Sequence, residues 1–222
     1  MTIDQPLVFE RRYFEDVYQA AYDQRNPRYK HRSYLREVRR VAPEGGTLLD
    51  VGCAYGSFLR EAAGSYSCTG CDVSQHAVDV ASERLPAVRV FQSDVLGLSP
   101  GGGHSVVTSF DVLEHVPDLD AALARLRMML KPGGVLAIAV PVYDTPVGRL
   151  AGRLDKDPTH VHKLSRYEWL DRVNAAGFES IRWRGILRYY FGGPWYLHWC
   201  SRSIRRFSSA ILVTGVAPEA GR

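Results

Sequence analysis

The stretch Leu48–Leu59, which reads LLDVGCAYGSFL, decides the fold of this 222-residue chain. A buried apolar strand over 47–51 breaks into a glycine turn, and an amphipathic helix with Phe58 and Leu59 at helical spacing follows. This order is typical of the first crossover of a nucleotide-binding α/β sheet, whose ligand lies at the carboxyl end of the strand. The stretch therefore predicts a ligand site at its own turn.

Three acids stand at the ends of the first three predicted strands. Asp50 lies in the first strand, Asp72 ends the second strand 22 positions later, and Asp94 follows the third. The spacing from Asp50 to Asp72 suits a carboxylate that binds a ribose diol, and Asp94 is placed to accept from an adenine amino group. The turn lacks the G-x-G-x-x-G spacing that cradles a pyrophosphate. An adenosine with an uncharged thioether link therefore fits this pattern.

Strands and helices alternate along the chain, which predicts a parallel sheet covered by helices on both faces. We expect strands at 47–51, 67–72, 88–92, 104–110 and 135–140, and helices at 57–63, 75–85 and 119–130. A loop is expected over 141–164, followed by a helix at 166–176 with a capping box of Ser165 and Glu168 and a terminating Gly177. Further strands are expected at 179–183 and 208–214, and two N-terminal helices near 9–22 and 31–41.

Five segments resemble, in order and in register, the motifs of class I S-adenosylmethionine-dependent methyltransferases, especially the small-molecule (type 11) group. They read LLDVGCAYG, GCDVSQHAVDVA, FQSDVLGL, TSFDVLEHVPD and LKPGGVLAIAVP, and the resemblance covers about 47–177. One departure is Ala54, where the family more often has glycine. The resemblance implies a Rossmann-like, seven-stranded, mostly parallel α/β sheet with an antiparallel last strand and helices on both faces.

The resemblance also implies a domain plan and a cofactor, S-adenosyl-L-methionine. An N-terminal helical cap is expected over 1–45 and the methyltransferase domain over 46–216, with an aromatic and basic insertion at about 184–207. The residues expected to bind the cofactor are Asp50, Gly52, Cys53, Ala54, Gly56, Asp72, Val73, Ser93, Asp94, Val95, Phe110, Asp111 and Tyr22.

Methyl transfer to a hydroxyl needs a base that works near neutral pH, for which histidine is suited. We expect His160, in the loop over the site mouth, to be this base, and His115, just after the fourth strand, is the competing candidate. No metal is expected, because the DxDxxHxH pattern over 155–162 has no recognised ligand frame. The C-x-x-C of Cys68 and Cys71 has no partner pair for zinc and lies along a predicted strand.

The segment 181–207 combines six arginines with three of the four tryptophans, and no acid occurs between Glu179 and Glu219. We expect a helix from Pro194 that places Trp195 and Trp199 one turn apart. Three interpretations stay open: the wall of a substrate pocket with arginines for an anionic group, a peripheral membrane contact near a lipid-linked substrate, or a structural insertion or dimer surface.

The function predicted from these features is methylation of a small-molecule acceptor, as O-methylation of a natural product, sugar or lipid-linked hydroxyl. N- or C-methylation is the alternative, and a non-catalytic cofactor-binding protein is the rival class. Nucleic acid is not an expected substrate, because the net charge is only +4 and no RNA-binding module is evident. With four scattered cysteines and no long apolar run, a cytoplasmic monomer or homodimer is expected.

Overall fold

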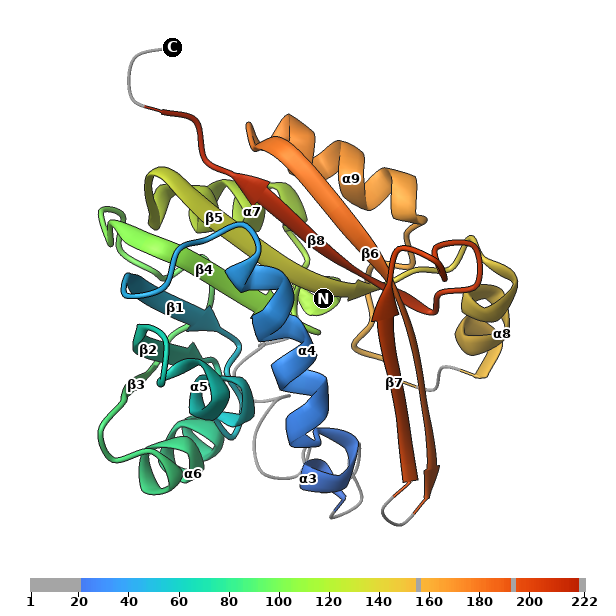
Figure 1. Cartoon of the computed structure of the whole chain (residues 1–222), viewed down its shortest axis with the longest axis horizontal. Coiled ribbons are helices and arrows are strands. Elements are labelled where there is room, and N and C mark those ends of the chain that lie inside the picture. The colour runs from blue at the N-terminus through green and yellow to red at the C-terminus, as the bar shows by residue number, and fades with distance from the viewer. Residues whose placement is uncertain (1–20, 155–156, 193–194, 220–222) are drawn as a thin grey trace.

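A computed structural model of the chain describes residues 21–154, 157–192 and 195–219. Within these residues an eight-stranded sheet has the strand order β3-β2-β1-β4-β5-β8-β6-β7 (Figure 1). The first five strands in this order run parallel, and β8 is antiparallel to both β5 and β6. The strands are β1 (Thr47–Val51), β2 (Ser67–Asp72), β3 (Arg89–Gln92), β4 (His104–Phe110), β5 (Leu130–Pro141), β6 (Glu179–Gly192), β7 (Trp195–Ser201) and β8 (Ala210–Val216).

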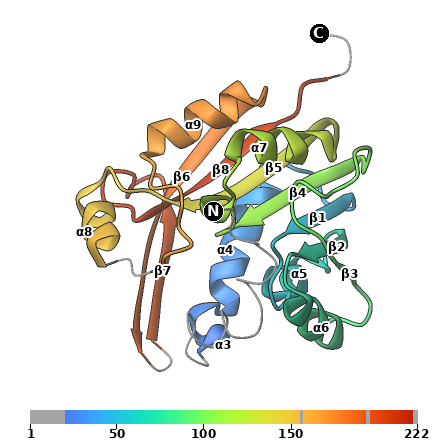
Figure 2. The same ribbon diagram turned by 180° about the vertical axis from the view of Figure 1, so that it is seen from behind.

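Helices cover both faces of the sheet, as the alternating pattern predicts (Figures 1 and 2). One apolar core contains Tyr34 of α4 and Leu59 of α5, and the other contains Leu123 of α7 and Trp169 of α9. The helices are α3 (Tyr22–Arg25), α4 (Arg28–Arg39), α5 (Ser57–Ala62), α6 (Gln75–Arg84), the 3-10 turn η1 (Leu113–His115), α7 (Leu119–Met128), α8 (Pro146–Leu154) and α9 (Arg166–Ala175).

The predicted capping box and terminating glycine are confirmed, and a further cap lies at the start of α6. The Ser74 side chain accepts from the amide of Ala77 at the start of α6, and Ser165 and Glu168 form a reciprocal capping box on α9. Gly177, with φ of 84°, follows the end of α9 in the left-handed conformation that glycine adopts without a steric penalty.

The C-terminal part differs from the sequence prediction in three ways. The expected helix from Pro194 is wrong, because Trp195–Ser201 forms β7, which pairs with a β6 much longer than expected. The sheet therefore has an eighth strand beyond the predicted seven. Trp195 and Trp199 are four positions apart, a spacing that fits one helix face and equally one strand face. Helix α8 also occupies part of the predicted 141–164 loop.

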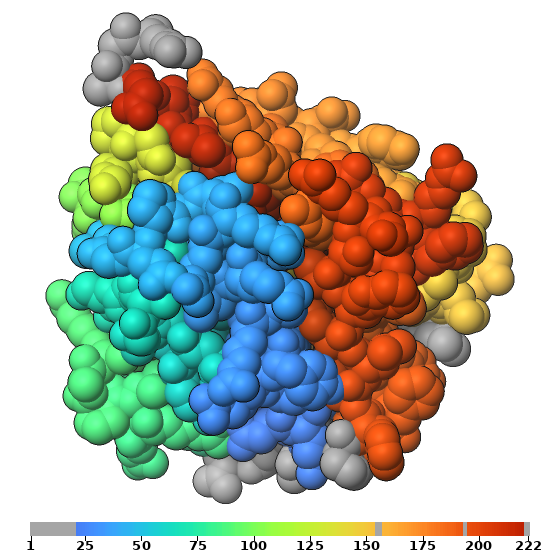
Figure 3. Space-filling model, viewed as in Figure 1, coloured from blue at the N-terminus to red at the C-terminus, as the bar shows by residue number. Residues whose placement is uncertain are grey.

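The β6–β7 hairpin extends beyond the strand ends on the same side as α3 (Figure 1). In the space-filling view α4 lies in the middle of this face. The segments that follow β1 in the chain lie on one side of α4, and the hairpin lies on the other side (Figure 3). The Tyr190 hydroxyl donates to Gln24 at 3.2 Å, and the Tyr29 hydroxyl donates to the carbonyl of Tyr196. These two hydrogen bonds connect the hairpin to α3 and α4. The second predicted N-terminal helix corresponds to α4, whereas the first, near 9–22, falls almost entirely outside the described residues.

Candidate functional site

A pocket opens where β1, β2 and β4 end, which is where the glycine turn predicts a ligand. Its empty space is about 1050 Å³, open solvent at the mouth included. Every residue expected to bind the cofactor lines this pocket except Gly56. Gly56 precedes α5 with φ of 73°, and a side chain on it would strike Leu85, 2.7 Å from the added carbon.

Asp72 ties the glycine turn to the end of β2. Its Oδ2 accepts from the Ala54 amide at 2.8 Å and its Oδ1 from the Ser74 amide at 3.0 Å. Ala54 has φ of 45°, a left-handed conformation that glycine adopts at lower cost. The turn therefore forms in spite of the extra methyl group, and the carboxylate is held at the pocket wall.

Gly52 allows the turn to pack against the segment after β4. It has φ of 75°, and a carbon added to it would lie 2.2 Å from the Val112 side chain. Close packing therefore requires glycine at position 52, because any side chain there would displace Val112, which also lines the pocket.

Asp50 is a buried carboxyl in the pocket, 3% exposed. Burial raises its pKa to about 7, opposed by the hydrogen bond from the Thr108 hydroxyl, while the charge of nearby Asp72 raises it further. The Thr108 oxygen is 2.6 Å from Oδ1 of Asp50. A carboxyl with so high a pKa gains strongly from a cation brought beside it.

Asp94 and its neighbours line the pocket beyond the end of β3. Oδ1 of Asp94 accepts from the Gly97 amide, and the Ser93 hydroxyl donates to the Asp94 carbonyl at 2.8 Å. The turn after β3 is fixed by these two bonds. The Asp94 carboxylate is exposed and has further lone pairs for an incoming donor.

The N-terminal helices supply a wall that the sequence prediction largely missed. Tyr22 was expected, and it lines the pocket with its ring 4.3 Å from that of Tyr55. Asn26, Lys30 and His31 also line the pocket but were not expected. Tyr22 lies in α3, Asn26 follows the end of α3 and Lys30 lies in α4, so no single helical pattern in the sequence marks this wall.

His31 is buried in this wall, 6% exposed, and neither ring nitrogen has a hydrogen-bond partner among the residues that the structure describes. Burial lowers its pKa well below the usual value, and the charge of Lys30 lowers it further. A neutral imidazole carries one donor and one acceptor. Because buried polar groups are nearly always satisfied, its position in the pocket fits a polar ligand.

Asp111 lines the pocket and joins three parts of the chain. Arg188 of β6 donates to its Oδ1 at 2.5 Å, and Lys30 of α4 donates to its Oδ2 at 3.2 Å. Burial works to raise the pKa of Asp111, but the two cations outweigh it and hold the pKa well below the usual range. Asp111 has φ of 59°, a conformation that aspartate tolerates better than most residues.

His115 and His160 lie together, with ring centroids 4.7 Å apart. His115 lines the pocket, whereas His160 lies behind it in the loop that follows α8. Backbone amides of Val161 and His162 donate to the Glu114 carbonyl, which anchors this loop on η1. His162 is bound to the Val116 carbonyl at 2.8 Å through Nε2. Of the two catalytic candidates, His115 is thus the one that reaches the pocket.

Glu114 lies beside the histidine pair, 1% exposed, and within the described part of the chain its Oε2 has no hydrogen-bond partner. Burial raises its pKa to about 8, and the negative charge of Asp111 raises it further. Glu114, His115 and His160 each offer a ligand atom within 4.8 Å of one another. The expectation of a metal-free site therefore stays a prediction. The DxDxxHxH pattern over 155–162 did not reveal this cluster, because the pattern does not include Glu114 or His115.

The C-x-x-C segment has the packing role expected of it. Cys71 is buried in β2 and Cys68 is partly buried in the same strand. Burial raises the pKa of Cys68 to about 12 and pushes that of Cys71 higher still, so both carry thiols at neutral pH. Thiols in this state are poor nucleophiles and poor metal ligands.

The pocket suits S-adenosylmethionine on its own chemistry. Three acids, Asp50, Asp72 and Asp94, line the pocket where the first three strands end, and His31 and Lys30 add polar groups from the N-terminal helices. The two glycines and Ala54 keep the turn narrow, and no residue of the turn offers a positive side chain for a pyrophosphate. The residues present therefore fit an adenosyl thioether better than a dinucleotide.

Comparisons with known proteins agree with this geometry. A methyltransferase-domain family model matches residues 22–182. The chain is 32% identical to a dTDP-3-amino-3,6-dideoxy-alpha-D-glucopyranose N,N-dimethyltransferase of Streptomyces fradiae, over 61% of this chain and 59% of that protein. It is 30% identical to a trans-aconitate 2-methyltransferase of Methylobacterium nodulans, over 68% of this chain and 63% of that one. The chain thus matches less than two thirds of the length of either relative.

A solved structure of a SAM-dependent methyltransferase from Thermotoga maritima shares the fold, with a TM-score of 0.73 over 92% of this chain and 97% of that one, at 19% identity. The fold is that of the class I S-adenosylmethionine-dependent methyltransferases. The chain belongs to the methyltransferase-domain family, and S-adenosylmethionine is its cofactor.

Proposed function

We propose that this chain methylates a hydroxyl of a small-molecule acceptor, such as a natural product, a sugar or a lipid-linked compound. The observation that supports this most is the histidine pair beside Glu114, because His115 lines the cofactor pocket next to the segment that follows β4. Bound S-adenosylmethionine supplies a methyl group already activated on a sulfonium. The chain's residues then need to orient the acceptor, exclude water and take up its proton.

In this proposal Asp72 binds the ribose hydroxyls, Asp94 accepts from the adenine amino group, and Asp50 faces the methionyl ammonium. The buried position and high pKa of Asp50 support the last assignment, since a cation at that place favours the ionised carboxylate. Tyr22 and His31 close the methionyl side of the pocket. The strands and helices that carry these groups pack in the two apolar cores, which holds the groups in place around the cofactor.

The proton of the acceptor hydroxyl passes to the histidine pair. The Thr159 hydroxyl lies 2.5 Å from a carboxylate oxygen of Asp157, to which it donates, and 2.8 Å from Nδ1 of His115. Its oxygen then accepts from Nδ1, so the His115 proton sits on Nδ1 and Nε2 is the ring nitrogen that carries the basic lone pair. His160, whose ring is tilted by 43° against that of His115, relays or stabilises the resulting charge.

Amine methylation is the second candidate, favoured by the 32% identity to the amino-sugar N,N-dimethyltransferase. A panel of matched acceptors that differ only in carrying a hydroxyl or an amine at one carbon separates the two. We expect S-adenosylhomocysteine formation with the hydroxyl members. Turnover confined to the amine members would move the assignment to N-methylation, and cofactor binding without turnover of any member would favour a non-catalytic role.

A further inference from the structure

The β6–β7 hairpin has one exposed apolar face. Cross-strand pairing of Tyr189 with Leu197 and of Leu187 with Trp199 sets side chains at alternate positions on the same side. The rings of Tyr189 and Phe191 contact each other, with centroids 4.7 Å apart. The exposed fractions on this face are 55% for Tyr189, 66% for Phe191, 73% for Trp195, 41% for Leu197 and 52% for Trp199.

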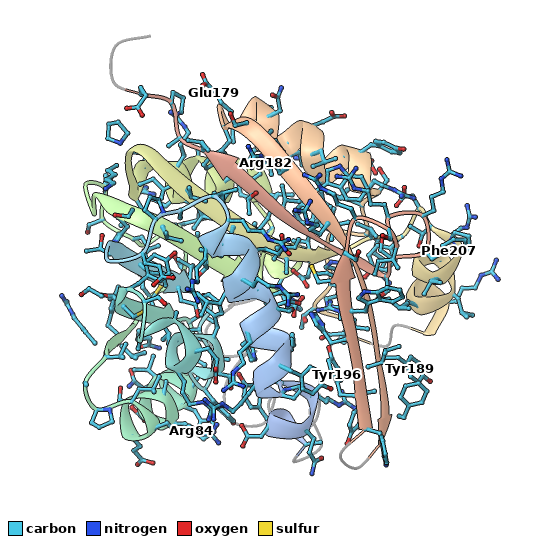
Figure 4. The ribbon with its side chains drawn as sticks, in the orientation of Figure 1. Arg84, Glu179, Arg182, Tyr189, Tyr196 and Phe207 are labelled. Carbon is cyan, nitrogen blue, oxygen red and sulfur yellow. The ribbon has the colours of Figure 1, made fainter. Side chains whose placement is uncertain are left out.

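The opposite face of the hairpin is already occupied. His198 lies 2.8 Å from the Ser33 hydroxyl of α4, and Arg25 of α3 stacks over the Tyr190 ring at 4.7 Å. Figure 4 shows Tyr196 on the side of the hairpin toward α3 and α4, with Tyr189 and Phe207 on the other side. The internal contacts therefore fix the hairpin so that its apolar face stays turned outward.

This face lies apart from the cofactor pocket, which among the described residues is lined by none of its five exposed side chains. A cluster of this size and exposure on a protein surface marks an interaction site. The charge around this face indicates which kind of partner it binds.

The surroundings of the face are basic. Arg202 and Arg206 are exposed in the loop after β7, next to Phe207, which is 57% exposed. Among the described residues no carboxylate forms an ion pair with either arginine. The Thr145 hydroxyl donates to the Ser208 carbonyl, which brings the start of α8 to this loop, and α8 exposes Arg149, Leu150 and Arg153.

We propose that the hairpin face binds the surface of an anionic lipid bilayer. Tryptophan and tyrosine prefer the interface between headgroups and acyl chains, and arginines beside them attract anionic headgroups. No helix among the described residues has the length and apolar composition to cross a bilayer, so the contact is peripheral. A second copy of the chain fits less well, because a symmetric contact brings arginines against arginines with no acid between Glu179 and Glu219.

Co-sedimentation with vesicles tests this proposal. We expect the full chain to bind vesicles of phosphatidylcholine mixed with phosphatidylglycerol, and to bind pure phosphatidylcholine far more weakly. The double variant Phe191→Ser and Trp195→Ser should lower the partition coefficient by about tenfold or more. Arg202→Gln and Arg206→Gln should each weaken binding to the anionic vesicles by about fivefold and leave the weak binding to pure phosphatidylcholine unchanged.

Met128→Ser on α7 is the matched control, since Met128 is 48% exposed on a helix outside the hairpin. It should bind vesicles like the unmodified chain, and all variants should retain S-adenosylhomocysteine affinity, which shows that they fold. Equal binding to both vesicle types, or binding that survives the double variant, would overturn the proposal. So would the absence of vesicle binding, and a dimer in light scattering that the double variant dissociates would then assign the face to a second copy.

Discussion

Asp72 is the single residue on which cofactor binding should depend most. In the proposed complex its carboxylate accepts from both ribose hydroxyls, and hydrogen bonds to a charged group contribute about 1.5–3 kcal/mol. We predict that Asp72→Ala weakens S-adenosylhomocysteine binding by about that amount in titration calorimetry. Asp79→Ala, an exposed acid on α6, is the control and should bind normally. Unchanged affinity in a folded Asp72→Ala protein would refute the assignment.

The histidine pair makes a prediction about rate rather than binding. A general base typically contributes ~10²–10⁴-fold, and it acts chiefly in the transition state. His115→Ala and His160→Ala should therefore lower turnover much more than cofactor affinity. Because His115 lines the pocket and His160 does not, the loss of His115 should remove the acid limb of the pH–rate profile. Loss of that limb in His160→Ala alone would make His160 the base, and normal turnover in both would indicate catalysis by alignment.

We expect the buried Asp50 carboxylate to lower the stability of the ligand-free protein and to strengthen cofactor binding. Its pKa is about 7 in the folded protein and about 4 in an unfolded chain. Unfolding therefore releases a proton between these values, and this contribution to stability is present at low pH and is lost as the pH rises through 7. Asp50→Asn should flatten the pH dependence of urea midpoints between about pH 4 and 7 and stabilise the ligand-free protein by roughly 2–4 kcal/mol at pH 8.

The same Asp50→Asn variant should lose cofactor affinity, because it removes the negative charge proposed to face the methionyl ammonium. Weaker binding together with higher stability is a pattern that a merely structural role does not produce. A variant that is less stable at pH 8, or that binds S-adenosylhomocysteine as well as the unmodified chain, would contradict the account of this residue.

At the scale of the element, the glycine turn carries backbone strain at Ala54. Its φ of 45° lies in the left-handed region, which costs an alanine roughly 1–2 kcal/mol, part of which is offset by the greater freedom of a glycine in the unfolded chain. We predict that Ala54→Gly raises the free energy of unfolding by about 0.5–1 kcal/mol. Cofactor affinity should be retained, since the Ala54 amide still donates to Asp72. A destabilised variant would mean that the methyl group packs favourably.

The hairpin shows why one element was misjudged from sequence. Pro194 can begin a helix, and the spacing of Trp195 and Trp199 suits a helix and a strand equally. What decides for a strand is pairing with residues of β6 up to 16 positions away, together with contacts to α4, such as that of His198 with Ser33. Contacts of that kind are not visible in local spacing.

Across the whole molecule, the parallel half of the sheet could be predicted because each strand ends in a recognisable turn or acid. Asp50, Asp72 and Asp94 meet at one edge for the simple reason that parallel strands end together. The wall made by Asn26, Lys30 and His31 could not be placed in this way, since it depends on how α4 lies across the sheet. The link from Arg188 to Asp111 joins residues of β6 and the end of β4, and only the assembled fold brings them together.

The central claim is that the pocket at the strand ends binds S-adenosylmethionine through these acids. A crystal structure with S-adenosylhomocysteine tests it most directly. We predict the ribose hydroxyls within hydrogen-bond distance of Asp72, the adenine amino group at Asp94, and the methionyl part between Asp50 and His31. A ligand bound elsewhere, or in this pocket with its ribose away from Asp72, would contradict the account.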